Sequence, residues 1–236
     1  MPSARLEELG WATTDKGEIS LRRRLDPRLG EVHEVVLDDE YLMSSAFTVA
    51  ERALADAGLG AHPAGPGDRL DVVVGGLGLG CTAAQALADP RVGRLVVVEA
   101  LEAVVDWHRR RLLPDSAVLL DDPRCALVVD DVFGRFAAPD GLGAGGVDVV
   151  LLDVDHSPVH LLHPDHAPAY AVEGLARLAG QLRADGVFAL WADLEPDPLF
   201  LGRLEEVFAA ARADVVQFAN PLTGGTGVAT LYVAST

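Results

Sequence analysis

The sequence predicts an α/β protein in which a small N-terminal β unit precedes a Rossmann-like, doubly wound sheet. Three observations predict it: the apolar run LDVVVGG at 70–76, the alternation of strand-like and helix-like segments after it, and two strand-like segments at the end that are joined by a tight turn. Apolar runs of this kind are typical of strands that are buried on both faces of a parallel sheet. Strands that alternate with helices indicate right-handed βαβ crossovers.

The first part of the chain is predicted to be mostly β structure. Polar and apolar residues alternate at 18–24 and 31–37, a turn lies at 26–30, and a short strand-like piece follows at 41–43. A helix is expected at 46–59, with Gly58 as its stop signal. The Pro- and Gly-rich stretch 62–67 then predicts a boundary between an N-terminal unit, 1–62, and a catalytic domain, 63–236.

The remaining segments complete the sheet. Helices are predicted at 82–88, 101–113, 174–183 and 199–211, and strands at 94–100, 125–133, 147–155, 186–192, 213–222 and 227–235. The turn at 223–225, Thr-Gly-Gly, makes the last two strands a hairpin, so the final strand must run antiparallel to its neighbour. With this hairpin the predicted sheet resembles that of the class I S-adenosylmethionine-dependent transferases, whereas a dinucleotide-binding Rossmann domain does not require a terminal hairpin.

Composition limits the classes of partner. The 236 residues carry a formal net charge of −17, which argues against nucleic acid and against an anionic membrane surface and favours a cationic small molecule. Two cysteines cannot form a disulfide scaffold, and no apolar run has the length of a membrane span or a signal peptide. These features predict a cytoplasmic protein.

A glycine-rich loop follows the first buried strand and opens a helix. Gly76, Gly78 and Gly80 allow a sharp turn and a close approach of the backbone to a ligand at a helix N-terminus. The spacing fits the GxGxG of methyltransferases, and with Ala83 it also fits the GxGxxA of NAD-binding proteins. A purely structural turn is the third interpretation.

Acidic residues end the next two predicted strands. Glu99 lies where a carboxylate accepts hydrogen bonds from ribose hydroxyls, and Asp131 lies where one accepts a hydrogen bond from an adenine amino group. Either acid alone could be a solvated strand end. Together with the glycine loop they predict a nucleoside crevice at the carboxyl ends of the strands.

The loop after the fourth strand of the large sheet carries the candidate catalytic groups. Asp153, Asp155 or His156 could remove a proton from a nucleophile, and Asp153 could instead hold a cationic amine. The alternative is a loop-capping aspartate beside a surface histidine. Four histidines, which stand at 156, 160, 163 and 166, suggest a metal, but three nearby prolines argue against an aligned ligand set. We therefore expect no metal and a lid over the site.

The order of these features resembles the spermidine synthase family. The resemblance rests on the β unit, the glycine loop, Glu99, the segment Val-Asp-Asp-Val-Phe at 129–133, Asp153 with a nearby proline, and Tyr170. It implies a homodimer that uses decarboxylated S-adenosylmethionine to aminopropylate a diamine.

The resemblance also implies roles for individual residues. Glu99 would bind the ribose, Asp130 and Asp131 would bind the cofactor with Asp131 at the adenine, and Asp153 would face the attacking amine. The predicted acceptor site comprises Met43, Tyr170 and Trp191.

Several positions depart from the family pattern. Gly78 stands where the family's GGGDGG loop has an aspartate, and His156 replaces a second acid in the family's DSSDP loop. Met43 and Trp191 stand where the family has glutamines. Trp191 could hold an amine through a cation–π contact or could simply pack in the core.

These departures lead to a hypothesis about the reaction. We expect a transferase that uses S-adenosylmethionine or its decarboxylated form, and the missing acid at Gly78 favours methyl transfer to an unidentified small acceptor, which could be an amine. The first alternative is a polyamine aminopropyltransferase in which Asp155 replaces the missing acid of the acceptor site. An NAD-dependent oxidoreductase and a non-catalytic nucleoside-binding protein are further alternatives.

Overall fold

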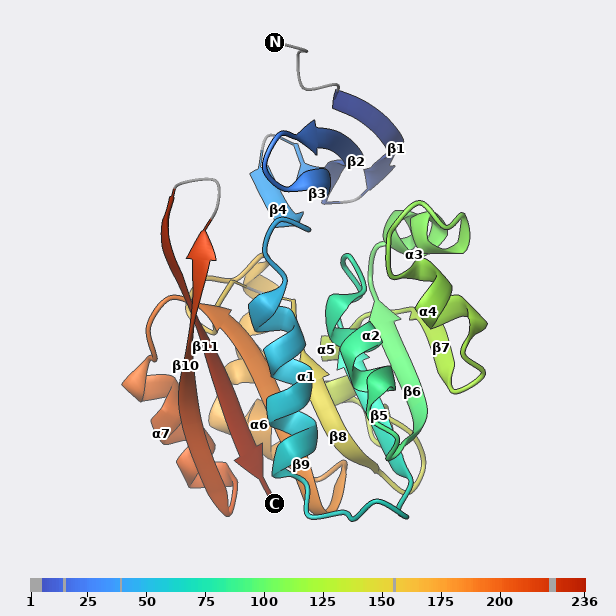
Figure 1. Ribbon diagram of the computed structural model, residues 1–236. Coiled ribbons are helices and arrows are strands. Elements are labelled where there is room, and N and C mark those ends of the chain that lie inside the picture. The colour runs from blue at the N-terminus through green and yellow to red at the C-terminus, as the bar shows by residue number, and fades with distance from the viewer. Residues whose placement is uncertain (1–5, 15, 39, 155, 221–223) are drawn as a thin grey trace.

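The computed structural model contains two sheets and describes residues 6–14, 16–38, 40–154, 156–220 and 224–236. A four-stranded sheet has the order β1-β2-β3-β4, and a seven-stranded sheet has the order β10-β11-β9-β8-β5-β6-β7. Figure 1 shows the small sheet above the end of the large sheet to which its parallel strands point. The predicted fold class, a Rossmann-like sheet preceded by a small β unit, is confirmed.

The small sheet is an antiparallel meander. Its strands are β1 (Leu6–Thr14), β2 (Gly17–Asp26), β3 (Gly30–Leu37) and β4 (Glu40–Ser44). Strand β1 was not predicted, because it is an edge strand without a buried residue and its pairing with β2 is interrupted by a bulge between Glu8 and Gly10. At that bulge Gly10 gives room to the indole of Trp107, so β1 packs against helix α3 (Glu102–Arg109).

The large sheet combines a parallel core with an antiparallel end. The parallel strands are β5 (Leu70–Gly75), β6 (Val92–Glu99), β7 (Cys125–Val129), β8 (Val147–Leu152) and β9 (Leu182–Asp193). Strand β11 (Gly225–Ser235) lies between β9 and β10 (Ala210–Asn220) and runs antiparallel to both. The predicted hairpin is therefore confirmed, although residues 221–223 at its turn lie outside the described residues.

Helices cover both faces of the large sheet (Figure 1). They are α1 (Val49–Ala61), α2 (Cys81–Ala88), α3 (Glu102–Arg109), α4 (Ser116–Asp121), α5 (Val132–Ala137), the 3₁₀ helix η1 (Pro164–Tyr170), α6 (Val172–Ala179) and α7 (Pro198–Val207). One core forms under α1 to α4 and a second under α5 to α7. Helix α1 packs on β8, β9 and β11, although the predicted boundary at residue 62 assigns it to the N-terminal unit. No helix in the described part of the chain is long and apolar enough to cross a membrane.

Several predicted element bounds were wrong for local reasons. The strand predicted at 125–133 ends at Val129, because the Asp131 carboxylate accepts a hydrogen bond from Phe133 N and starts α5. The helix predicted at 101–113 ends at Arg109, and Arg111 has a positive φ of 58° that a helix does not allow. The last two residues of the helix predicted at 174–183 belong to β9, and the last two residues of the helix predicted at 199–211 belong to β10.

The contact of α1 with the large sheet yields a stability prediction. A Cβ at Gly58 would collide with Leu151 Cδ2 and lie 3.1 Å from Ala189 Cβ, whereas a Cβ at Gly60 would meet nothing within 4 Å. We expect Gly58→Ala to lower the free energy of unfolding by about 1–3 kcal/mol. The matched control Gly60→Ala should leave it unchanged or raise it by up to about 1 kcal/mol, since alanine favours helix. Urea denaturation of both variants measures the difference, and equal effects would contradict this packing.

Candidate functional site

The glycine loop lies between β5 and α2 and needs its glycines. Gly76, Gly78 and Gly80 have φ values of 91°, 47° and 89°, in the left-handed region that side chains rarely adopt. A Cβ at Gly76 would collide with the carbonyl oxygen of Asp153, and a Cβ at Gly80 would lie 2.9 Å from His108 Cε1. The loop is therefore wedged between the end of β8 and helix α3.

Glu99 holds this loop from the end of β6. Its Oε2 accepts a hydrogen bond from Leu77 N at 2.9 Å, and its Oε1 accepts one from Leu101 N at 2.9 Å. Each carboxylate oxygen keeps a second lone pair, so the group can also accept hydrogen bonds from two ligand hydroxyls. This position and capacity agree with the predicted ribose contact.

The two acids after β7 are engaged in local contacts. Asp131 caps α5, and Asp130 forms an ion pair with Arg135 at 2.8 Å and accepts a hydrogen bond from Asp131 N. Both residues are exposed at the same edge of the sheet as Glu99. Their predicted contact with the cofactor therefore stays a prediction, and capping is the role that the geometry gives to Asp131.

Asp153 follows β8 and faces the helices. Its backbone N–H donates to Gly75 O at 2.8 Å, and its Oδ2 lies 2.7 Å from Thr82 Oγ1. The same hydroxyl lies 3.1 Å from the carbonyl oxygen of Glu51 in the first turn of α1. A hydroxyl has one proton, so both contacts are satisfied together only when Asp153 is protonated and donates to Thr82.

The surroundings of these two acids favour the protonated form. Burial raises the pKa of Asp153 to about 6, against the opposing effect of the Thr82 hydrogen bond. Burial and the neighbouring charge of Asp153 raise the pKa of Glu51 to about 7. Carboxyls that titrate near neutral pH are suited to accept a proton from a reacting group. Sequence reasoning missed Glu51, because only the packing of α1 against α2 brings it to Asp153.

His156 lies between two carboxylates from different parts of the chain. Its Nδ1 is 3.9 Å from Asp193 Oδ2 at the end of β9, and its Nε2 is 3.7 Å from Glu40 Oε1 on β4. The backbone N–H of Asp193 also donates to His156 O at 2.6 Å. The predicted residue His156 therefore links the large sheet to the N-terminal sheet. Asp155 lies outside the described residues.

Three buried polar atoms around His156 have no hydrogen-bond partner among the described residues. Among the described residues, His156 Nε2, Trp191 Nε1 and Asp193 Oδ1 are buried and form no hydrogen bond. Trp191 and Asp193 point to the same face of β9, since they are two residues apart. Buried polar atoms are almost always satisfied by protein, water or ligand. The group therefore has unused hydrogen-bonding capacity for a polar ligand.

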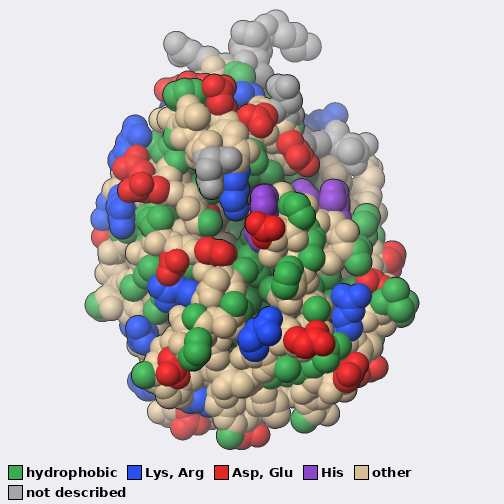
Figure 2. Space-filling view, turned by 180° about the vertical axis from the view of Figure 1, so that it is seen from behind, with side chains coloured by type: hydrophobic (Ala, Val, Ile, Leu, Met, Phe, Trp, Pro, Cys, Tyr) green, Lys and Arg blue, Asp and Glu red, His purple; other side chains and the backbone are tan. Residues whose placement is uncertain are grey.

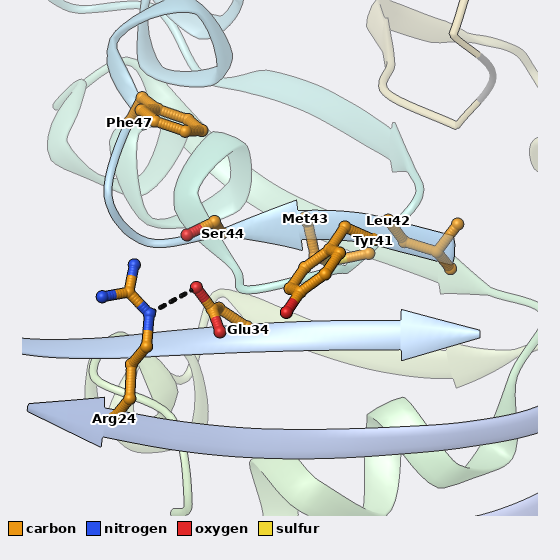
Figure 3. Close-up of a pocket in the computed structure, with 7 residues that line it drawn as sticks. All are labelled: Arg24, Glu34, Tyr41, Leu42, Met43, Ser44 and Phe47. Carbon is orange, nitrogen blue, oxygen red and sulfur yellow. Dashed lines mark hydrogen bonds and ion pairs between the residues drawn. The ribbon is translucent and has the colours of Figure 1, made fainter. Parts of the chain in front are cut away.

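Met43 brings the N-terminal sheet to the glycine loop. Its Sδ lies 2.9 Å from the position of a Cβ at Gly78, so an acidic side chain at Gly78 would collide with it. Met43 also lines a cavity of about 380 Å³ on the N-terminal sheet, together with the ion pair between Arg24 and Glu34 at 2.8 Å (Figure 3). Of the predicted site residues Met43 alone lines this cavity, so we place the candidate site at the carboxyl ends of the large sheet.

The structure does not bring Tyr170 to this group. Tyr170 is 2% exposed and packs against Phe133 and Phe200 in the core under α5 to α7.

The four histidines of the sequence cluster lie in two pairs. The ring centroids of His156 and His160 are 4.9 Å apart, and those of His163 and His166 are 6.0 Å apart. Figure 2 shows histidine side chains gathered beside acidic ones on the rear face. The described residues contain no group of three or more side chains that could hold a metal.

The strand order, the glycine loop and the acids at the strand ends define a class I Rossmann-like transferase fold. No protein-family profile matches the chain. The polyamine aminopropyltransferase of Pyrobaculum neutrophilum is 30% identical over 157 residues, which cover 65% of this chain and 50% of that protein. The match thus spans half the length of the curated relative.

Two crystal structures share the fold over 97% of this chain and 72% of theirs, each at 20% identity. The spermidine synthase of Thermotoga maritima has a TM-score of 0.71, and a spermidine synthase in complex with the transition state analogue AdoDATO has a TM-score of 0.70. The chain therefore has the spermidine synthase fold. Together with the curated relative, these structures confirm the resemblance to the spermidine synthase family.

The raised pKa values of Asp153 and Glu51 predict a pH dependence of stability. Because these carboxyls bind protons more tightly in the folded than in the unfolded chain, their contribution to stability falls as pH rises from about 4 to about 7. Asp153→Asn should therefore gain stability relative to the unmodified protein over that range, by roughly 1–3 kcal/mol. Urea denaturation at several pH values measures the difference.

The control for this measurement replaces a carboxyl on the surface. Asp165, whose side chain is 88% exposed, lies in the same connection between β8 and α6. The difference between Asp165→Asn and the unmodified protein should not rise with pH. A gain for Asp153→Asn that is the same at pH 4 and pH 7 would contradict the burial of an ionisable Asp153.

Proposed function

We propose that the protein is an aminopropyltransferase that uses decarboxylated S-adenosylmethionine and a small amine acceptor. The comparisons support this proposal because the curated relative is named a polyamine aminopropyltransferase and one structural neighbour binds the analogue AdoDATO. They favour this alternative over the methyl transfer that the missing acid at Gly78 indicated. The proposal departs from that first hypothesis for a physical reason, which is the charge of the site.

The observation that carries the proposal is the acidity of the crevice. Four carboxylates lie around it, from β4, α1, β8 and β9: Glu40, Glu51, Asp153 and Asp193. None of the described side chains that we assign to the site is a lysine or an arginine. The guanidinium of Arg52, which follows Glu51, forms an ion pair with Asp115 at 2.7 Å. Among the described residues of the site, the crevice therefore offers carboxyl groups and no unpaired cation, and a bound cation would favour the ionised forms of Asp153 and Glu51.

This charge discriminates between the two forms of the cofactor. Intact S-adenosylmethionine carries a carboxylate, which would need a cationic partner in the crevice, whereas the decarboxylated form carries only positive groups. Like charges that are brought together in a partly buried site cost several kcal/mol. The same acids would attract a protonated amine acceptor. Aminopropyl transfer to an amine thus fits the site better than methyl transfer does.

The residues of the site fit decarboxylated S-adenosylmethionine, and each would have a separate role. Glu99, which lies beside the loop at 76–80, would hold the ribose hydroxyls. Decarboxylated S-adenosylmethionine, when bound, supplies an electrophilic carbon next to its sulfonium. Asp153 would accept the proton that the acceptor nitrogen loses, and Thr82 fixes the orientation of that carboxyl. Asp193 Oδ1, which has no partner among the described residues, would accept a hydrogen bond from the remaining ammonium group of the acceptor.

Product analysis tests the proposed reaction. We expect release of methylthioadenosine from decarboxylated S-adenosylmethionine only when an amine such as putrescine is present. Asp153→Asn should lower kcat by about 10²–10⁴-fold, as expected when a general base is lost. Asp165→Asn is the matched control and should retain activity. Formation of S-adenosylhomocysteine from intact S-adenosylmethionine, with no methylthioadenosine, would instead support methyl transfer.

The acceptor contacts make a separate prediction. Asp193→Asn removes a carboxylate from the acceptor side and should raise KM for the amine by about tenfold, with little change in the Kd of the nucleoside. Glu195→Gln, an exposed change of the same charge two residues later, is the control. Steady-state kinetics and calorimetry measure the two constants. A weaker nucleoside with an unchanged KM for the amine would contradict the assignment of Asp193.

A further inference from the structure

A fully buried imidazole lies beneath the glycine loop. His108 on α3 is 0% exposed, its Nε2 is 2.9 Å from Gly78 O, and its Nδ1 is 3.1 Å from Ser116 Oγ on α4. A carbonyl oxygen only accepts hydrogen bonds, so Nε2 carries the proton and Nδ1 accepts from the Ser116 hydroxyl. Burial lowers the pKa of His108, in agreement with this neutral form. Ser116 therefore selects the tautomer that binds the loop.

The loop needs such a partner because its own conformation is weakly determined. Glycines populate many backbone conformations, and three of the five residues from Gly76 to Gly80 are glycines with positive φ. Hydrogen bonds hold both ends of the segment, from Gly76 N to Val98 O at 2.9 Å and from Ala84 N to Gly80 O at 2.8 Å. Between them lie the bonds from Leu77 N to Glu99, from Gly80 N to Leu77 O at 2.8 Å, and from His108 to Gly78 O. His108 supplies the contact that determines the direction of the peptide between Gly78 and Leu79.

The direction of that peptide has a consequence for ligand binding. A trans peptide is planar, and its N–H points opposite to its C=O. The N–H of Leu79 therefore points away from His108, and no described residue accepts a hydrogen bond from it. We propose that His108 is a positioning residue that directs the Leu79 N–H into the nucleoside crevice, as a donor to an oxygen of the bound ribose. This inference rests on the proposed nucleoside site.

If His108 positions the loop, a side chain that can donate a hydrogen bond to Gly78 O should preserve nucleoside binding. If His108 only fills space in the core, an apolar side chain of similar size should preserve it equally well. An amide nitrogen of glutamine reaches the place of the histidine Nε2 and can donate to Gly78 O, whereas leucine fills similar space without a donor. We expect His108→Leu to weaken binding of methylthioadenosine by about three- to tenfold, which is the worth of one hydrogen bond. His108→Gln should bind within about twofold of the unmodified protein, whatever its thermal stability.

Calorimetric titration with methylthioadenosine, the nucleoside without the aminopropyl group, tests the inference. If the unmodified protein binds it and His108→Leu binds it equally well, His108 is only a core residue and the proposed function stands. If the unmodified protein binds neither methylthioadenosine nor decarboxylated S-adenosylmethionine, the proposed function fails and this inference fails with it. Should the leucine variant not fold, His108→Asn replaces it, because its amide is too short to reach Gly78. Equal affinity of the asparagine and glutamine variants would then overturn the positioning role.

Discussion

The parallel pairing of β5 with both β6 and β8 is the constraint on which the site depends. In this register Gly75 lies opposite Val98 on one side and Leu152 on the other, so the residues that follow each strand emerge together at one edge of the sheet. One hydrogen bond then joins Asp153 N to Gly75 O, and another joins Leu77 N to Glu99. A shift of either strand by one residue would turn these side chains to the opposite face. Backbone pairing thus positions the glycine loop, the acid that is predicted to bind the ribose and the candidate base.

The same edge of the sheet brings together acidic side chains that do not stabilise the fold. Burial of Asp153 beside Glu51 makes the ionised forms of both acids unfavourable, and the Thr82 hydroxyl can satisfy only one of the two oxygens that it contacts. Such groups lower stability near neutral pH, and they are often retained where a cationic ligand or a proton transfer uses them. The formal net charge of −17 extends this preference over the molecule. Electrostatics therefore connects the stability of the protein with its proposed choice of a decarboxylated, cationic nucleoside.

Local patterns in the sequence predicted most of the large sheet, because buried strands, glycine turns and the final hairpin each have a short-range signal. They also predicted Glu99 and Asp153, which follow directly from strand ends. They did not predict Glu51 and His108, whose roles arise when α1 and α3 pack beside the glycine loop. Asp193 ends β9 and could have been found by the rule that identified Glu99. The sequence indicates a loss of amine-binding groups at Gly78 and Met43, because it shows each position separately. The structure brings other acids from β4, α1 and β9 to the same region.

The proposed function requires the crevice to bind a sulfonium nucleoside that lacks a carboxylate. Calorimetric titration of the unmodified protein with decarboxylated and intact S-adenosylmethionine tests it most directly, because the two ligands differ only in that group. We expect the decarboxylated form to bind at least about tenfold more tightly, which corresponds to roughly 1.4 kcal/mol. Tighter binding of the intact form would contradict the electrostatic argument, and binding of NADH with neither sulfonium nucleoside would contradict the assignment of the crevice.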